Sequence, residues 1–153
     1  MNTNQTVDSL NYTEVIDEMT KRIEQNEYDA DAFFNRAVAY KHNDYLLHAL
    51  SDINNAIRSG DENIEYICTR AMICSEIGKN DAALADYKHA MLINPNDIAP
   101  YLGIAEVYFK MKNHLKAITY YDMAIKFDPE NREIHRKRSK VFEDMSCDSD
   151  HMF

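Results

Sequence analysis

Small and bulky apolar residues recur along the chain at a period of 34 residues, so that segments 30–63, 64–97 and 98–131 align without a gap. Alanine occupies the eighth, twentieth and twenty-seventh positions of every segment: Ala37, Ala49, Ala56, Ala71, Ala83, Ala90, Ala105, Ala117 and Ala124. Mostly bulky residues occupy the fourth, eleventh and twenty-fourth positions: Phe33, Tyr40, Ile53, Ile67, Cys74, Tyr87, Tyr101, Tyr108 and Tyr121. The repetition predicts three copies of one structural unit.

The spacing within each segment is that of two helices. Positions 4, 8 and 11 share one face of a first helix, and positions 20, 24, 27 and 28 share one face of a second. Alanine at a crossing lets two antiparallel helices approach to about 8 Å. Residues typical of helix ends lie at the expected boundaries: Gly60, Gly78, Asn80, Pro95, Asp97 and Pro129. Each segment is therefore predicted to be an αα-hairpin.

At these positions the chain resembles the tetratricopeptide repeat (TPR) family. The family pattern has a small residue at eight, alanine at twenty, an aromatic residue at twenty-four and proline near thirty-two. The resemblance covers two thirds of the chain and implies an all-α fold, an α-solenoid of stacked helical hairpins. Departures are Asp61 in place of the first proline, and Arg36 and Arg70 at position seven, where the third repeat has Ile104.

Partial repeats are predicted on both sides of the three hairpins. Residues 9–26 form an N-terminal helix with the pattern of a second helix, although Arg22 stands where alanine belongs; the matching residues are Tyr12, Val15, Met19 and Ile23. Residues 132–145 form a capping helix with the pattern of a first helix, carried by Ile134, His135, Arg138, Ser139 and Phe142. The prediction is thus a single TPR domain over 1–153, with disordered ends at 1–8 and 146–153.

The charge argues against nucleic acid and membranes as general partners. The net charge is −9, and an acidic surface repels phosphate groups and anionic lipids. The stretch 132–140 is an exception with a net charge of +4, and we interpret it as the polar outer face that a terminal repeat needs. Nucleic-acid binding by this stretch is the weaker alternative. Because no apolar run reaches the length of a membrane span or a signal peptide, a cytoplasmic location is expected.

The sequence has no pattern typical of catalysis. The six histidines, at 42, 48, 89, 114, 135 and 151, include no pair spaced three or four residues apart. Cys68, Cys74 and Cys147 lie in no metal-ligand spacing, and no glycine-rich phosphate loop or nucleophile motif is present. We therefore expect no enzyme activity, no metal and no cofactor.

A second stripe on the first helices, at positions 5, 9 and 12, lies about 100° around the helix from the hairpin core. It cannot pack inside its own hairpin. Resemblance to the TPR family implies that these residues face a concave groove, the usual ligand site of the family. They are Phe34, Val38, Lys41, Cys68, Met72, Ser75, Leu102, Glu106 and Phe109.

Six of these nine groove residues are apolar, which predicts a scaffold or adaptor that binds a peptide or amphipathic helix of another protein. In the alternatives, these side chains pack against neighbouring repeats, a terminal segment of the chain itself fills the groove, or the groove or an end repeat is buried in a homodimer. The clamp that some TPR modules use for acidic chaperone tails is not expected. The corresponding positions lack the Lys and Asn side chains that the clamp needs, and hold Phe34, Val38, Thr69, Ala99 and Gly103.

Overall fold

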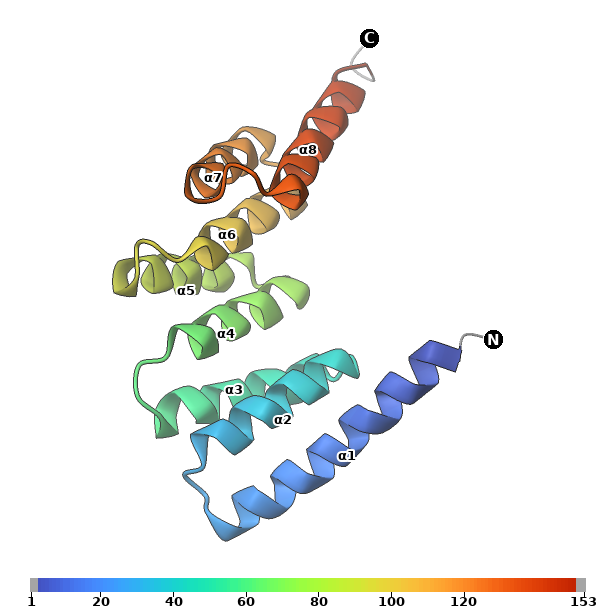
Figure 1. The fold of residues 1–153 in the computed structure, drawn as a ribbon, viewed down its shortest axis with the longest axis vertical. Helices are drawn as coiled ribbons and strands as arrows, with labels where there is room; N and C mark the ends of the chain where they lie inside the picture. The colour runs from blue at the N-terminus through green and yellow to red at the C-terminus, as the bar shows by residue number, and fades with distance from the viewer. Residues whose placement is uncertain (1–2, 151–153) are drawn as a thin grey trace. The chain divides into compact units, whose positions relative to one another are not determined.

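The computed structural model describes the backbone of residues 3–150 and the side chains of residues 11–147. This part of the chain forms eight α-helices and no strand (Figure 1). The helices are α1 (Thr3–Gln25), α2 (Ala30–His42), α3 (Leu46–Ser59), α4 (Ile64–Glu76), α5 (Asn80–Ile93), α6 (Ile98–Lys110), α7 (His114–Phe127) and α8 (Arg132–Asp150). The prediction of an all-α helical repeat fold is confirmed.

The helices follow the sequence period. The first residues of α2, α4, α6 and α8 are spaced 34 residues apart, and so are those of α3, α5 and α7. Three of the first helices begin after an Asp or Asn whose side chain accepts a hydrogen bond from a backbone N–H of the first turn: Asp29, Asn63 and Asp97. Such N-caps satisfy donors that the helix itself leaves unpaired.

The contacts divide the chain into two compact units, residues 1–79 and 80–153, where the sequence predicts one domain. Unit 1 holds α1 to α4 and unit 2 holds α5 to α8, so the division falls in the turn between α4 and α5. In a repeat array each helix buries its apolar face only against its neighbours, so no single core has to join the whole chain.

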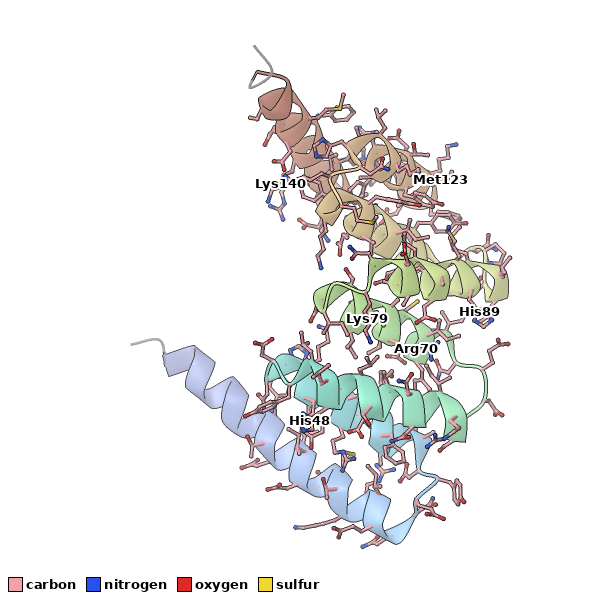
Figure 2. All side chains as sticks on the ribbon, turned by 180° about the vertical axis from the view of Figure 1, so that it is seen from behind. His48, Arg70, Lys79, His89, Met123 and Lys140 are labelled. Carbon is pink, nitrogen blue, oxygen red and sulfur yellow. The ribbon has the colours of Figure 1, made fainter. Side chains whose placement is uncertain are left out.

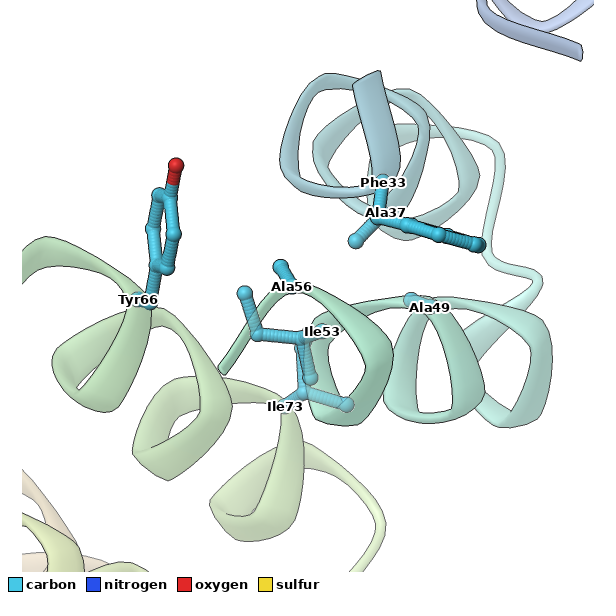
Figure 3. Packing of buried hydrophobic residues seen from close by; sticks show 7 residues of the cluster. All are labelled: Phe33, Ala37, Ala49, Ile53, Ala56, Tyr66 and Ile73. Atoms are coloured by element: carbon cyan, nitrogen blue, oxygen red, sulfur yellow. The ribbon is translucent and has the colours of Figure 1, made fainter. Parts of the chain in front are cut away.

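The alanines that recur at the 34-residue period are completely buried. All nine alanines of the repeat pattern have 0% of their surface exposed. In unit 1, Ala37 of α2 lies opposite Ala49 and Ala56 of α3, and Ile53 fills the adjoining space (Figure 3). Ile73 of α4 packs against the same cluster. The small residues therefore lie where helices cross, as the sequence predicts.

Both terminal helices are longer than the sequence predicts. Helix α1 begins at Thr3 rather than at residue 9, and α8 continues to Asp150 rather than ending at residue 145. The two helices thus include residues 3–8 and 146–150, which the sequence assigns to disordered ends, while residues 1–2 and 151–153 lie outside the described residues. Neither helical extension contains a glycine or proline to end the helix, and polar composition alone was a weak reason to expect disorder.

The arginines at position seven are not weak points of the repeat. Each one donates a hydrogen bond to a residue sixteen positions earlier, on the preceding second helix: Arg36 to Thr20, Arg70 to Asn54 and Arg138 to Asp122. Arg138 occupies this position because α8 continues the register of the repeats. Position seven therefore links one hairpin to the helix before it.

Candidate partner-binding groove

In unit 1 the predicted groove residue Phe34 is partly covered by a residue of the next repeat. The ring of Phe34 on α2 stacks on that of Tyr66 on α4, with 4.8 Å between centroids. Tyr66 is itself held by a hydrogen bond of 2.6 Å that its hydroxyl donates to Asp31. Burial, together with this bond, raises the pKa of Tyr66 to about 12. Phe34 is therefore half-buried, and only part of its ring is available to a ligand.

The remaining unit 1 positions range from exposed to buried. Met72 has 41% of its surface exposed, whereas Ser75 on the same helix is buried. Val38 and Cys68 are half-buried. Lys41 forms an ion pair of 3.3 Å with Glu76 of α4. The apolar side chains on this surface that a partner could reach are thus Met72 and parts of Val38, Cys68 and Phe34.

Unit 2 has a distinct pocket of about 430 Å³ beside α6 and α8. Two predicted groove residues, Glu106 and Phe109 of α6, line it, whereas the third, Leu102, is half-buried on the same helix and does not. The full lining is Glu106, Phe109, Tyr121, Arg136, Lys137, Ser139, Lys140 and Glu143. Tyr121 is 2% exposed, and its burial raises the pKa of its hydroxyl above the usual range.

The sequence prediction missed the contribution of α8 to this pocket. Counted from the start of α8, Arg136, Lys140 and Glu143 are at positions 5, 9 and 12, the same positions as the predicted groove residues of the earlier first helices. The signal was present in the 34-residue period, which continues into α8. The polar and charged side chains of residues 132–145 indicate a cap and conceal this second role. The groove stripe therefore changes along the chain from apolar to charged.

Most of the basic stretch 132–140 is engaged in ion pairs. Lys137 contacts Glu106 of α6 at 2.5 Å, and Arg138 contacts Asp122 of α7 at 2.5 Å. Arg136 pairs with Glu133 of its own helix at 2.7 Å, and this bond holds the pKa of the exposed Glu133 carboxyl below its usual value. Two of these three pairs attach α8 to the preceding hairpin. The side chain of Lys140, labelled in Figure 2, has no ion-pair partner among residues 11–147.

The lining of the pocket combines aromatic rings with side chains of both charges. Phe109 and Tyr121 supply ring surface, and Arg136, Lys140 and Glu143 are among the charged residues. Within the described part of the chain, no group of three or more His, Cys, Asp or Glu side chains could hold a metal ion. None of the described helices is long and apolar enough to cross a membrane. The surface is suited to noncovalent recognition of a side chain or short segment.

Residues 77–141 match the family model described as Tetratricopeptide repeat. Over residues 77–141 the chain carries tetratricopeptide repeats. It is 31% identical over 91 residues to Tetratricopeptide repeat protein 6 of Homo sapiens, a match that covers 60% of this chain and 17% of that protein. Across the curated relatives, the matches span only 10% to 29% of the relatives' length.

Solved TPR structures share the fold at low sequence identity. The crystal structure of MamA is 16% identical and superposes with a TM-score of 0.78, covering 95% of this chain and 86% of that one. The first TPR of Spaghetti (RPAP3), bound to an HSP90 peptide, is 16% identical, with a TM-score of 0.68 and coverage of 76% and 93%. TPR proteins are typically interaction modules rather than enzymes.

Proposed function

We propose that this TPR protein is a non-enzymatic scaffold or adaptor that holds a peptide or helix of another protein through the groove stripe of its first helices. The unit 2 pocket carries the proposal, because a cavity of about 430 Å³ opens where positions 9 and 12 of α6 meet the equivalent positions of α8. In unit 1 the proposed positions are Phe34, Val38, Lys41, Cys68, Met72 and Ser75. In unit 2 they are Leu102, Glu106 and Phe109 together with Arg136, Lys140 and Glu143.

The chemistry of the stripe suits an apolar anchor with polar flanks. Phe109 and Tyr121 offer ring surface, and a few buried anchors usually carry most of the affinity of an interface. Met72 is an exposed, flexible and polarisable side chain that adapts to ligands of different shape. The charges around the pocket would set the orientation of the bound segment rather than its affinity.

The Spaghetti structure supports the proposal in outline, since it is a TPR bound to an HSP90 peptide and shares this fold. An acidic tail held by a clamp is not the ligand that we propose here. Thr69 is buried, and Gly103 has no side chain to offer. Nucleic acid is also not proposed, because three of the five basic residues in 132–140 already pair with carboxylates.

Affinity capture from a cell lysate, followed by mass spectrometry, tests the groove. Met72→Glu should lower the amount of captured protein at least tenfold, because a charge at an apolar contact must be desolvated without a partner. Met123→Glu is the matched control, since Met123 of α7 is exposed to a similar degree, 38% against 41%, and lies outside the stripe (Figure 2). Phe109→Ala tests the pocket of unit 2 in the same way.

The three variants should keep the helical circular dichroism and the unfolding temperature of the parent chain to within a few degrees, because none alters a helix crossing. If neither Met72→Glu nor Phe109→Ala changes the capture, the groove does not bind the captured proteins and the proposal is wrong. Capture that Met123→Glu abolishes equally would show that the effect is not specific to the stripe.

A further inference from the structure

Helix α8 presents charges of both signs to the unit 2 pocket, in a fixed order along its axis. Arg136, Lys140 and Glu143 all line the pocket and are all exposed. At about 100° per residue, they fall within an arc of about 60° on one side of the helix. At about 1.5 Å per residue, Lys140 lies about 6 Å and Glu143 about 10.5 Å beyond Arg136. This charged strip is thus positive at one end and negative at the other.

The positive end of the strip is available to a ligand. Lys140 has no ion-pair partner among residues 11–147. Arg136 pairs with Glu133 on the exposed surface of α8, and such a pair costs little to exchange. The contact between α8 and α6 uses other charges, since Lys137 pairs with Glu106 at 2.5 Å. A ligand can therefore engage the strip without breaking the ion pair that holds the two helices together.

An apolar anchor point lies between the two ends of the strip. The half-buried Phe109 follows Glu106 by three residues on α6, and Lys140 follows Lys137 by three residues on α8. Because the chain reverses at each of the two turns between them, α6 and α8 run in the same direction (Figure 1). The Phe109 ring should therefore lie level with Lys140, one turn beyond the ion pair.

A ligand that carries one sign of charge, or none, is a poor complement to this pocket. An uncharged ligand would cover charged groups without pairing them, which costs free energy. An acidic ligand would place a carboxylate against Glu143, and a basic ligand would meet Arg136 and Lys140. The best complement has an acid opposite the positive end, an apolar side chain on Phe109 and a base opposite the negative end.

The spacing of the strip favours a helical ligand. On a helix, residues seven positions apart share one side and are separated by about 10.5 Å, which matches the separation of Arg136 and Glu143. On an extended strand, side chains of one face follow each other at about 6.7 Å, so one step is too short and two steps are too long.

We propose that the unit 2 pocket binds an amphipathic helix of another protein that carries an acidic and a basic residue seven positions apart, with an apolar residue between them. The acid pairs with Arg136 and Lys140, the apolar side chain contacts Phe109, and the base pairs with Glu143. This inference rests on the function proposed above and names the ligand class of its unit 2 site. Because the charges are exposed, the preference for this ligand should shrink as salt is added.

Fluorescence anisotropy with labelled helical peptides of about 20 residues tests the proposal. The peptides differ only at two positions seven apart, on either side of a leucine. These positions hold glutamate and lysine in either order, two glutamates, two lysines or two glutamines. At least one of the mixed peptides should bind the parent chain about fivefold more tightly than every peptide with like charges or none.

Charge reversal in the pocket should change this preference in a defined direction. Glu143→Lys makes the strip entirely positive, so the peptide with two glutamates should become the tightest ligand. Arg136→Glu combined with Lys140→Glu makes it entirely negative, so the peptide with two lysines should become the tightest. Lys126→Glu, at an exposed position of α7 outside the pocket, is the control and should leave the preference for the mixed peptide unchanged.

The proposal is overturned if the parent chain binds none of the peptides at up to about 1 mM, or if it prefers a peptide of like charges. Variants that keep the preference of the parent chain overturn it as well. If the peptide with two glutamines binds as tightly as the mixed peptides and Phe109→Ala weakens both, the charge requirement is wrong while the groove remains a ligand site. The lysate capture described above judges the groove separately, because it does not depend on the charges of a chosen peptide.

Discussion

Helices α2 in unit 1 and α6 in unit 2 occupy the same place in the repeat but are fixed by different interactions. In α2, position seven is Arg36, whose guanidinium donates to both carboxylate oxygens of Asp52, at 2.6 and 2.9 Å, and to the Thr20 hydroxyl at 3.0 Å. In α6, position seven is Ile104, which is completely buried. The residue before it is Gly103, whose missing side chain leaves room for the Tyr87 ring of α5.

The difference shows that the repeat backbone tolerates either directional polar bonds or close apolar contact at one position. In unit 1 the Arg36 side chain joins α1, α2 and α3 through polar bonds, and the hydrogen bond to Asp52 raises the pKa of Arg36. It requires every partner to be present, because an unpaired buried charge is costly. The apolar contacts of Ile104 and Gly103 in unit 2 leave no charge to be paired, but a side chain added at Gly103 would contact the Tyr87 ring.

The largest effect on stability should come from breaking the ion pair between Arg36 and Asp52 in unit 1. Arg36→Met leaves the buried Asp52 carboxylate without its partner, and we expect the free energy of unfolding to fall by about 3 kcal/mol. Replacing both residues, as Arg36→Met with Asp52→Leu, should recover most of this loss, since two apolar side chains leave no charge unpaired. Urea denaturation followed by circular dichroism measures both variants.

Ile104→Val in α6 gives the matched comparison, with an expected loss of about 1 kcal/mol from the deleted methylene group. If Arg36→Met costs no more than Ile104→Val, the ion pair of unit 1 is not the stabilising interaction that its geometry indicates. A double variant as unstable as Arg36→Met alone would instead point to lost packing of the arginine stem.

The sequence was sufficient to predict the helices because the signal repeats. Nine alanines fixed the period, and the period fixed where the inner helices begin. The role of Arg36 is not predictable in this way, because its partners Asp52 and Thr20 lie on other helices. The terminal helices are longer than the sequence predicts because polar composition does not by itself end a helix.

The candidate site was only partly accessible to sequence reasoning. Periodicity selects Glu106 and Phe109, but whether a cavity forms depends on how α8, which packs on α7, lies beside α6. The stacking of Phe34 on Tyr66 is likewise only one of the alternatives that the sequence allows. Stripe positions can be read from the sequence, but the degree to which neighbours fill them cannot.

The next largest effect on stability should come from disturbing the close contact between Gly103 and the Tyr87 ring in unit 2. A Cβ added at Gly103 would lie 2.2 to 2.6 Å from atoms of the Tyr87 ring, which is 4% exposed. Gly103→Ala should therefore lower the free energy of unfolding by about 2 kcal/mol, although alanine alone favours a helix by about 1 kcal/mol. Urea denaturation provides the measurement.

Tyr87→Leu supplies the control, because a smaller side chain leaves room for the new methyl group. In that background Gly103→Ala should be neutral or stabilising. Equal losses in both backgrounds would contradict the account, since the cost would then arise from the helix itself rather than from contact with the ring.

The smallest expected effect concerns two buried tyrosines, Tyr66 in unit 1 and Tyr121 in unit 2. Burial raises the pKa of both, but Tyr66 also donates to Asp31. Tyr66→Phe should therefore cost about 1 kcal/mol at neutral pH, the usual net value of a hydrogen bond. Because the folded chain holds the Tyr66 proton more tightly, its contribution is complete below pH about 10 and is lost as the pH rises toward about 12.

Tyr121→Phe sharpens the comparison, since the described residues give its hydroxyl no hydrogen bond to lose and its removal should leave neutral stability nearly unchanged. Both variants should flatten the decline in stability above pH about 10, because each removes a group whose deprotonation favours unfolding. Urea midpoints at neutral pH and across the alkaline range measure the two effects separately. A larger neutral loss for Tyr121→Phe than for Tyr66→Phe would show that the bond to Asp31 contributes nothing.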